Sequence, residues 1–392
     1  MTVILIGNYL PDGQPSMQRF AANMATGLAA EGIKAIVIRP EIVWGRLAAK
    51  VPRLQKWAGY IDKLVILPQR LRKLATGSSA QGEPTIFHVC DHSNASYVRS
   101  LTSVPHVVTC HDLFAVRSAL GEIPQHTTRW SGRQLQALIT QGLRQAKKIV
   151  CDSEATRRDV LRLLQPDPER VSTALLSFNP LDWAPHSAST TGDWRDMVKR
   201  ISGHSPNPAL KRYVLHVGGE SWYKNRHGVA RIFSQVKAAT AEGLGLVFVG
   251  PPLPAALQDF IASQPGMTEC VITLQGVTDR ELATLYRSSE ALLFPSLDEG
   301  FGWPVLEAHA CGCRVITSLR GSLPEVGGTA AYYIDPDDEA GAARVLEAVL
   351  TQTEDQRKQA SQAALANAAR FSLQATTRQY ISIYEQLLHT QS

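Results

Sequence analysis

Long apolar runs and cysteine pairs with CxxC spacing are both absent from this sequence of 392 residues. A helix needs roughly 18 consecutive apolar residues to cross a bilayer, and no run of that length occurs. The first residues lead directly into a strand-like run, Val3 to Ile6, which predicts that the chain has no signal peptide. We therefore expect a cytoplasmic protein whose contact with the inner face of the membrane is at most peripheral.

The cysteines point to structural rather than chemical roles. They are scattered along the chain and lack the CxxC spacing that is typical of zinc sites. Since several of them end apolar runs, we expect reduced, buried and unreactive thiols. The six residues are Cys90, Cys110, Cys151, Cys270, Cys311 and Cys313.

Length and composition favour two α/β domains. The chain is long for a single domain, and its content of 44% hydrophobic and 19% charged residues is that of an ordinary globular protein. In the N-terminal half, short apolar runs rich in β-branched residues alternate with helical patterns, which predicts a doubly wound parallel sheet. The expected strands are 2–6, 35–38, 85–89, 107–109 and 148–150, and a helical pattern covers 19–31.

A second domain is expected to begin near Tyr213. The segment before it is rich in Pro, Ser, Thr and Trp and suits a linker, whereas Tyr213 to Val217 begins a new apolar strand that ends at glycines. We place the N-terminal domain at 1–185, the linker at 186–212, the C-terminal domain at 213–370 and a last helix at 371–392.

The segment 294–312 carries the strongest chemical signal. A buried strand, 291–294, ends at a turn containing Glu299, and Pro304 and Gly312 suit the start and the end of a short helix that contains Glu307. The N–H groups at such a helix start are partly positive, so this turn can bind a phosphate or a sugar hydroxyl between two carboxylates. Taken alone, the two acids would more simply be residues that favour the helix dipole.

Together with its flanks, this segment resembles the Glu-x7-Glu motif of the retaining family-4 glycosyltransferases of the GT-B fold. The flanking stretches 274–289 and 315–327 resemble the strand, turn and helix pieces that precede and follow the motif in that family. The resemblance implies two Rossmann-like doubly wound domains that face each other across a cleft, with a C-terminal helix that crosses back to the N-terminal domain. The N-terminal domain would then bind the acceptor, and the C-terminal domain the nucleotide sugar.

The resemblance also implies roles for individual residues. Glu307 would hold the ribose, Glu299 the sugar hydroxyls and Lys224 the diphosphate, and His111 would approach the donor sugar. We expect Glu299, His111 and Lys224 to be the catalytic residues. The full donor-binding set is Gly13, Lys224, Asn225, Gly276, Val277, Glu299, Gly300, Phe301, Gly302, Val305, Leu306 and Glu307, and Asp91 with His92 would lie on the acceptor side.

One position departs from the family pattern. Where the family usually has an arginine just after the glycine that ends the first strand of the second domain, this chain has Gly219 and Glu220. A lysine at 224 still supplies one charge for the leaving diphosphate. No Asp-x-Asp pair stands at a suitable loop, so we expect no metal or other cofactor, and the mechanism implied by the family needs no covalent intermediate.

A basic and apolar stretch, 44–74, is the best indication of the acceptor. Its mixture of Lys and Arg with aromatic and aliphatic residues suits either an anionic membrane surface or a solvated basic face over an ordinary core. No nucleic-acid recognition motif accompanies the positive net charge. Membrane contact would favour a glycan or lipid-linked glycan acceptor in cell-surface polysaccharide synthesis. A sugar-nucleotide 2-epimerase of the same fold and a non-catalytic nucleotide-sugar-binding protein remain the alternatives.

Overall fold

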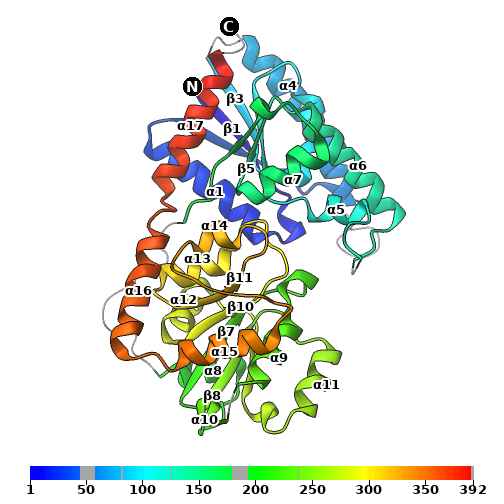
Figure 1. Ribbon diagram of the computed structural model, residues 1–392. Coiled ribbons are helices and arrows are strands. Elements are labelled where there is room, and N and C mark those ends of the chain that lie inside the picture. The colour runs from blue at the N-terminus through cyan, green and yellow to red at the C-terminus, as the bar shows by residue number, and fades with distance from the viewer. Residues whose placement is uncertain (45–57, 81–82, 125, 179–192, 237, 390–392) are drawn as a thin grey trace. The chain divides into compact units, whose positions relative to one another are not determined.

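The computed structural model describes residues 1–44, 58–80, 83–124, 126–178, 193–236 and 238–389 (Figure 1). The chain divides into two compact units. The first contains Met1–Ser177 and Leu373–Ser392, and the second contains Phe178–Ser372.

The first unit is built on a six-stranded parallel sheet in the order β2-β1-β3-β4-β5-β6. The strands are β1 (Thr2–Ile6), β2 (Lys34–Ile38), β3 (Thr85–Val89), β4 (His106–Cys110), β5 (Lys148–Cys151) and β6 (Val171–Thr173). The five expected strands are present, and β6 is an additional edge strand that the sequence reading missed. Strands β1, β4 and β5 are almost wholly buried because helices cover the sheet, which explains their continuous apolar sequences.

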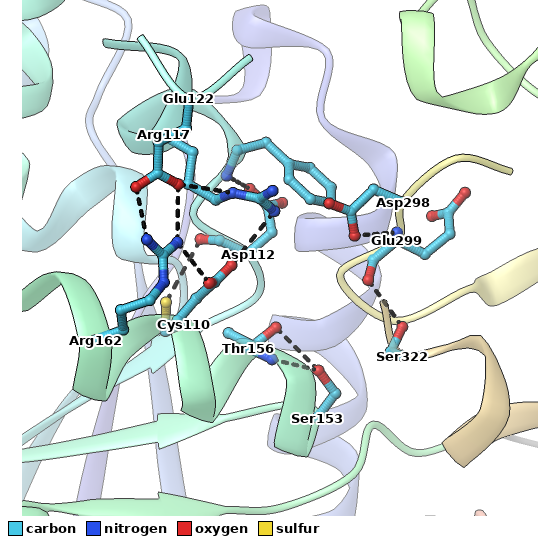
Figure 2. Close-up of polar contacts among 12 residues, drawn as sticks. Cys110, Asp112, Arg117, Glu122, Ser153, Thr156, Arg162, Asp298, Glu299 and Ser322 are labelled. Atoms are coloured by element: carbon cyan, nitrogen blue, oxygen red, sulfur yellow. Dashed lines mark hydrogen bonds and ion pairs between the residues drawn. The ribbon is translucent and has the colours of Figure 1, made fainter. Parts of the chain in front are cut away.

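Helices connect these strands and pack on the sheet. They are α1 (Pro15–Ala30), α4 (Leu67–Ala80), α5 (Phe114–Ala119), α6 (Trp130–Gln145), α7 (Glu154–Leu164) and α17 (Leu373–His389), with a π-helical turn at Asp62–Ile66 and 3-10 turns at Leu10–Asp12, His92–Ser100 and Pro168–Arg170. Ser153 is the N-cap of α7, where its hydroxyl accepts a hydrogen bond of 3.0 Å from the N–H of Thr156 (Figure 2).

The last helix, α17, is part of the first unit and packs along α1, as the family resemblance implied (Figure 1). The two helices meet at Gly27, where a Cβ atom would lie only 2.0 Å from Oγ1 of Thr377. On its inner face, the hydroxyl of Tyr384 is bonded to Nδ1 of His88 at 2.7 Å, and the hydroxyl of Tyr380 is bonded to Oγ1 of Thr109 at 2.9 Å. Buried polar pairs therefore fix α17 in register on β3 and β4.

The second unit repeats the architecture with the strand order β12-β11-β10-β7-β8-β9, again all parallel. The strands are β7 (Arg212–Val217), β8 (Leu244–Val249), β9 (Val271–Leu274), β10 (Ala291–Phe294), β11 (Val315–Ser318) and β12 (Tyr332–Ile334). The helices are α8 (Trp194–Ser202), α9 (Arg226–Ser234), α10 (Ala238–Ala241), α11 (Ala255–Ser263), α12 (Asp279–Ser288), α13 (Trp303–Ala310), α14 (Leu323–Gly327), α15 (Glu339–Leu350) and α16 (Glu354–Ala368), with 3-10 turns at Trp222–Lys224 and Met267–Glu269.

The range 186–212 is not a linker throughout. Its first part, up to residue 192, lies outside the described residues, but Trp194–Ser202 forms α8, which Asp193 caps through a hydrogen bond to the N–H of Arg195. Trp194, Met197 and Val198 are buried against the second unit. The apolar residues of this short helix were hidden in the sequence by the polar residues between them.

No described helix is both long and apolar enough to cross a membrane.

Candidate functional site

The loops at the carboxyl ends of β7 and β10 bring Lys224 and Glu299 together. Nζ of Lys224 lies 2.8 Å from Oε1 of Glu299, and the hydroxyl of Ser296 donates to the same oxygen at 2.9 Å. Burial raises the pKa of the Glu299 carboxyl above its ordinary value, and the charge of Lys224 and the two hydrogen bonds oppose this rise. Both donors bind Oε1, so Oε2 makes no hydrogen bond with a described residue.

Backbone and side-chain hydrogen bonds join these two loops into one surface. The amide of Asn225 donates to the carbonyl of Pro295 at 3.0 Å, and the N–H of Leu297 donates to the carbonyl of Tyr223 at 2.7 Å. Asn225 has a left-handed conformation with φ of 51°, and its side chain also caps α9 by accepting from the N–H of Gly228. Asn225 therefore holds the lysine loop against the glutamate loop and does not itself present a free side chain.

Ser322, in the loop after β11, contacts the backbone of Glu299 (Figure 2). The hydroxyl of Ser322 lies 3.0 Å from the carbonyl oxygen of Glu299 and 2.7 Å from that of Phe301, and its N–H donates to the first of them at 3.1 Å. Gly321 has φ of 58°, and a Cβ there would lie 2.5 Å from the carbonyl oxygen of Glu299. This contact between two backbones fixes the turn that carries the carboxylate.

The expected helix after this turn is present as α13. Gly302 is its N-cap with φ of 101°, Pro304 lies in its first turn, and Gly312 follows it with φ of 69°. The N–H groups of Phe301 and Gly302 make no hydrogen bond within the described residues. These two donors are therefore available at the positive end of the helix.

Two predicted backbone donors are already in use. The N–H groups of Val305 and Leu306 both point to the carbonyl of Gly302, at 3.0 and 3.4 Å. This tight first turn reduces what these two residues can offer a diphosphate.

Glu307 lies within α13 and is 6% exposed. It accepts a hydrogen bond of 3.1 Å from the hydroxyl of Tyr286, which comes from α12 and is fully buried. The second carboxylate is thus held in place from the neighbouring helix. The other predicted donor residues of this unit, Gly276 and Val277, follow the carboxyl end of β9, and within the described residues they form no hydrogen bond with either glutamate.

In the first unit, His111 follows β4 and is almost fully buried. Its Nδ1 lies 3.2 Å from Oδ2 of Asp152 and its Nε2 lies 2.9 Å from the carbonyl oxygen of Cys90. Burial alone would lower the pKa of His111, but the hydrogen bond and charge of Asp152, with the charge of Asp91, raise it to about 9. Burial in turn raises the pKa of Asp152 to about 7, so the two groups titrate as a coupled pair. Both ring nitrogens of His111 are engaged within this unit.

The acceptor-side residues also form a network. Asp91 accepts from the N–H and hydroxyl of Ser93, at 2.8 and 2.6 Å, and from the amide of Asn8. Nδ1 of His92 accepts from the backbone N–H of His111 at 3.4 Å. Gly13, with φ of 62°, ends the turn after β1 and has open space where a Cβ would lie. In the part of the chain that is described, no group of three or more His, Cys, Asp or Glu residues could hold a metal ion.

Three supporting residues were missed in the sequence. Ser296 and Ser322 orient Glu299, and Tyr286 orients Glu307. Ser296 stands in the same loop, so its position alone could have suggested it. Ser322 and Tyr286 reach the site only because β11 and α12 pack beside β10 and α13, which a sequence pattern does not reveal.

Solved structures with the same arrangement of two parallel sheets define the class of fold. A glycosyltransferase from Rickettsia africae superposes with a TM-score of 0.70 at 16% identity, covering 99% of this chain and 98% of that one. Anabaena Alr3699/HepE, solved with UDP and glucose, superposes with a TM-score of 0.65 at 15% identity, covering 98% and 100%. The fold is GT-B.

Sequence comparison gives the family. Residues 17–174 match Glycosyltransferase Family 4, and residues 198–366 match Glycosyl transferases group 1. The O-antigen chain mannosyltransferase B of Escherichia coli is 28% identical over 72% of this chain and 70% of its own length. Alignments with three further relatives span only 58% to 63% of their lengths. The chain is a glycosyltransferase that belongs to group 1 and family 4.

Proposed function

We propose that this chain is a retaining glycosyltransferase that moves a sugar from a nucleotide-diphosphate-sugar donor to a hydroxyl of a glycan or lipid-linked glycan. The observation that carries the proposal is the geometry of Glu299. Its Oε1 is held by Lys224 and Ser296, and its Oε2 remains to accept a hydrogen bond from a sugar hydroxyl. The family and the O-antigen relative support a role in cell-surface polysaccharide synthesis.

In this proposal the second unit binds the donor. Lys224 and the two available N–H groups of Phe301 and Gly302 stabilise the negative charge that develops on the leaving diphosphate. Glu307, oriented by Tyr286, accepts from the ribose hydroxyls. No protein nucleophile is required, and detection of a glycosyl-enzyme adduct by mass spectrometry would contradict this step.

Both ring nitrogens of His111 have partners within the first unit, where they join Asp152 after β5 to the Cys90 carbonyl after β3. This supports a role other than the direct sugar contact that the family resemblance implied. We propose that His111 positions the acceptor-side loop that carries Asp91 and His92. In this proposal the backbone near Gly13 is the part of the first unit that contacts the donor.

The test is a transfer assay with a panel of nucleotide sugars, beginning with mannosyl donors because the Escherichia coli relative is a mannosyltransferase. Lys224→Met is expected to lower kcat/KM about 10²- to 10³-fold, as loss of one charge-stabilising group does elsewhere. Glu299→Gln is expected to lower it about 10- to 100-fold, because a neutral amide replaces a charged acceptor. Glu385→Gln on the exposed side of α17 is the matched control and should behave as wild type.

The products separate this function from its rivals. Transfer or slow donor hydrolysis with retention at the anomeric carbon supports the proposal, whereas release of a 2-epimer identifies an epimerase. Binding of a nucleotide sugar without any turnover would identify a non-catalytic binding protein.

We further propose that the first unit contacts an anionic membrane surface in the cytoplasm. Residues 45–57 of the predicted stretch lie outside the described residues. Around them, large apolar side chains are exposed, and the backbone N–H of Trp44 is tied to Oδ1 of buried Asp62 at 3.0 Å, which brings the two groups together. The exposed set is Ile42, Val43, Trp44, Ile61, Leu64 and Val65.

The charge near this apolar surface is positive. Arg70 pairs with Glu41 and Lys63 pairs with Asp12, but Arg72 and Lys73 on α4 have no ion pair within the described residues. Anionic headgroups attract such residues by roughly 1 kcal/mol each. Arg72→Glu with Lys73→Glu should therefore weaken binding to vesicles that contain anionic lipid. Equal binding by this variant and by the control Arg344→Glu with Lys358→Glu would refute membrane contact here.

A further inference from the structure

Arg226, the first residue of α9, is a buried cation beside the donor loops. It is 6% exposed, and its guanidinium lies 5.6 Å from the centre of the Phe248 ring. Its two terminal nitrogens donate to the carbonyls of Pro251 and Pro252, at 2.9 and 3.2 Å, and its Nε has no partner. Carbonyl oxygens satisfy part of its hydrogen bonding but carry no negative charge.

No carboxylate among the described residues forms an ion pair with Arg226. The other cations nearby are paired, Lys224 with Glu299 and Arg231 with Glu339. Glu220 acts on Arg226 only at longer range and is exposed, so water screens its charge. A buried and uncompensated charge is costly in the free protein, and an anionic ligand would remove that cost.

The groups around Arg226 add no second free charge. Burial, with a smaller contribution from the charges of Arg226 and Lys224, lowers the pKa of His216 to about 3. Its Nδ1 donates to the carbonyl of Leu293 at 2.9 Å, so the ring is neutral and its buried Nε2 has only a lone pair. Lys224 is paired with Glu299, so Arg226 is a buried cation here with which no carboxylate of the described residues pairs.

Glycines let these groups meet at the end of β7. A Cβ on Gly218 would lie 2.9 Å from Nε2 of His216 and 3.4 Å from Cβ of Lys224. A Cβ on Gly250 would lie 2.2 Å from the carbonyl oxygen of Gly218, so the turn after β8 packs directly on the turn after β7. Arg226 holds that second turn through Pro251 and Pro252.

We propose that Arg226 supplies the uncompensated positive charge that retains the donor diphosphate, in place of the family arginine where this chain has Gly219 and Glu220. The inference rests on the proposed function. Arg226 is a positioning residue. It holds the turn 250–252 and acts on the diphosphate through its charge, without touching the diphosphate itself.

The experiment measures the dissociation constant of the nucleoside diphosphate that wild type binds best, by calorimetry at low and high salt. Arg226→Met should weaken binding at least about tenfold, which corresponds to about 1.4 kcal/mol, and should reduce its salt dependence. Arg231→Met, which removes a half-buried arginine of the same helix that is paired with Glu339, should change neither. Thermal unfolding of each variant shows whether it is folded.

Two more variants separate charge from structure. Glu220→Arg combined with Arg226→Met should regain most of the lost affinity, because it restores a positive charge at the family position. Arg226→Lys keeps the charge if the methionine variant does not fold, and should bind within about threefold of wild type.

The outcomes distinguish the two proposals. If wild type binds no nucleoside diphosphate, the proposed donor site itself is wrong. If wild type binds and folded Arg226→Met binds equally well, only the role of Arg226 is overturned. Failure of the Glu220→Arg rescue, or a loss in folded Arg226→Lys as large as in the methionine variant, would also overturn the charge role.

Discussion

Replacing Ser296 by alanine tests how Glu299 is kept ionised. Burial raises the pKa of Glu299, and the Ser296 hydroxyl at 2.9 Å is one of the two donors that oppose it. Removing this donor should therefore raise the pKa further. A protonated carboxyl has lost an acceptor lone pair, so activity should fall as the pH is lowered through the pKa of Glu299. In the variant this fall should occur at a higher pH than in wild type.

The size of the effect follows from the hydrogen bond. A bond to a charged group contributes about 1.5–3 kcal/mol, and one pH unit corresponds to about 1.4 kcal/mol. The acid side of the profile of kcat/KM against pH should move toward neutrality by about 1 to 2 pH units. At alkaline pH, where Glu299 is ionised in both proteins, the loss of activity should be small.

The matched control is Ser318→Ala. Ser318 is equally buried and bonds the carbonyl of Ser296 at 2.5 Å, but it does not contact the carboxylate. It is expected to lower stability and leave the pH profile in place. If the acid limbs of wild type and Ser296→Ala lie at the same pH, Glu299 does not depend on this donor or need not be ionised.

Two further predictions concern stability. Tyr384→Phe leaves Nδ1 of His88 without its 2.7 Å partner and should lower the free energy of unfolding by about 1–3 kcal/mol, measured by denaturant titration; an unchanged midpoint and slope would contradict the buried pair. Gly321→Ala places a Cβ 2.5 Å from the Glu299 carbonyl oxygen, at a position with a left-handed backbone. It should lower the free energy of unfolding by at least about 1 kcal/mol, and it should also lower transfer activity. Wild-type values in both assays would show that this turn adapts freely.

Local signals explain why much of the fold was predictable. The apolar runs of β1, β3 and β10 and the pair Pro304 and Gly312 around α13 depend on neighbouring residues, and each is where the pattern placed it. The short edge strand β6 and the helix α8 were missed because each has few apolar residues, and only packing on a neighbour makes them regular.

The sequence predicted which residues belong to the candidate site better than it predicted which of them contact one another. The pairing of Lys224 with Glu299 joins residues far apart in the sequence and depends on β7 lying beside β10. The bond from His111 to the Cys90 carbonyl likewise depends on β3 lying beside β4, and it is the basis of the positioning role that we propose for this residue. Roles assigned to residue type alone do not account for what each atom already bonds.

The membership of α17 in the first unit has a consequence for biosynthesis. Residues 178–372 emerge from the ribosome before Tyr380 and Tyr384 do, although His88 and Thr109 were made long before. The second unit can thus fold while the first still lacks α17. Without α17, the helix α1 has no packing partner at Gly27, and the buried side chains of His88 and Thr109 lack the tyrosine hydroxyls that they bond. A released chain that is truncated after residue 372 should hold a folded second unit beside an incomplete first one that chaperones bind.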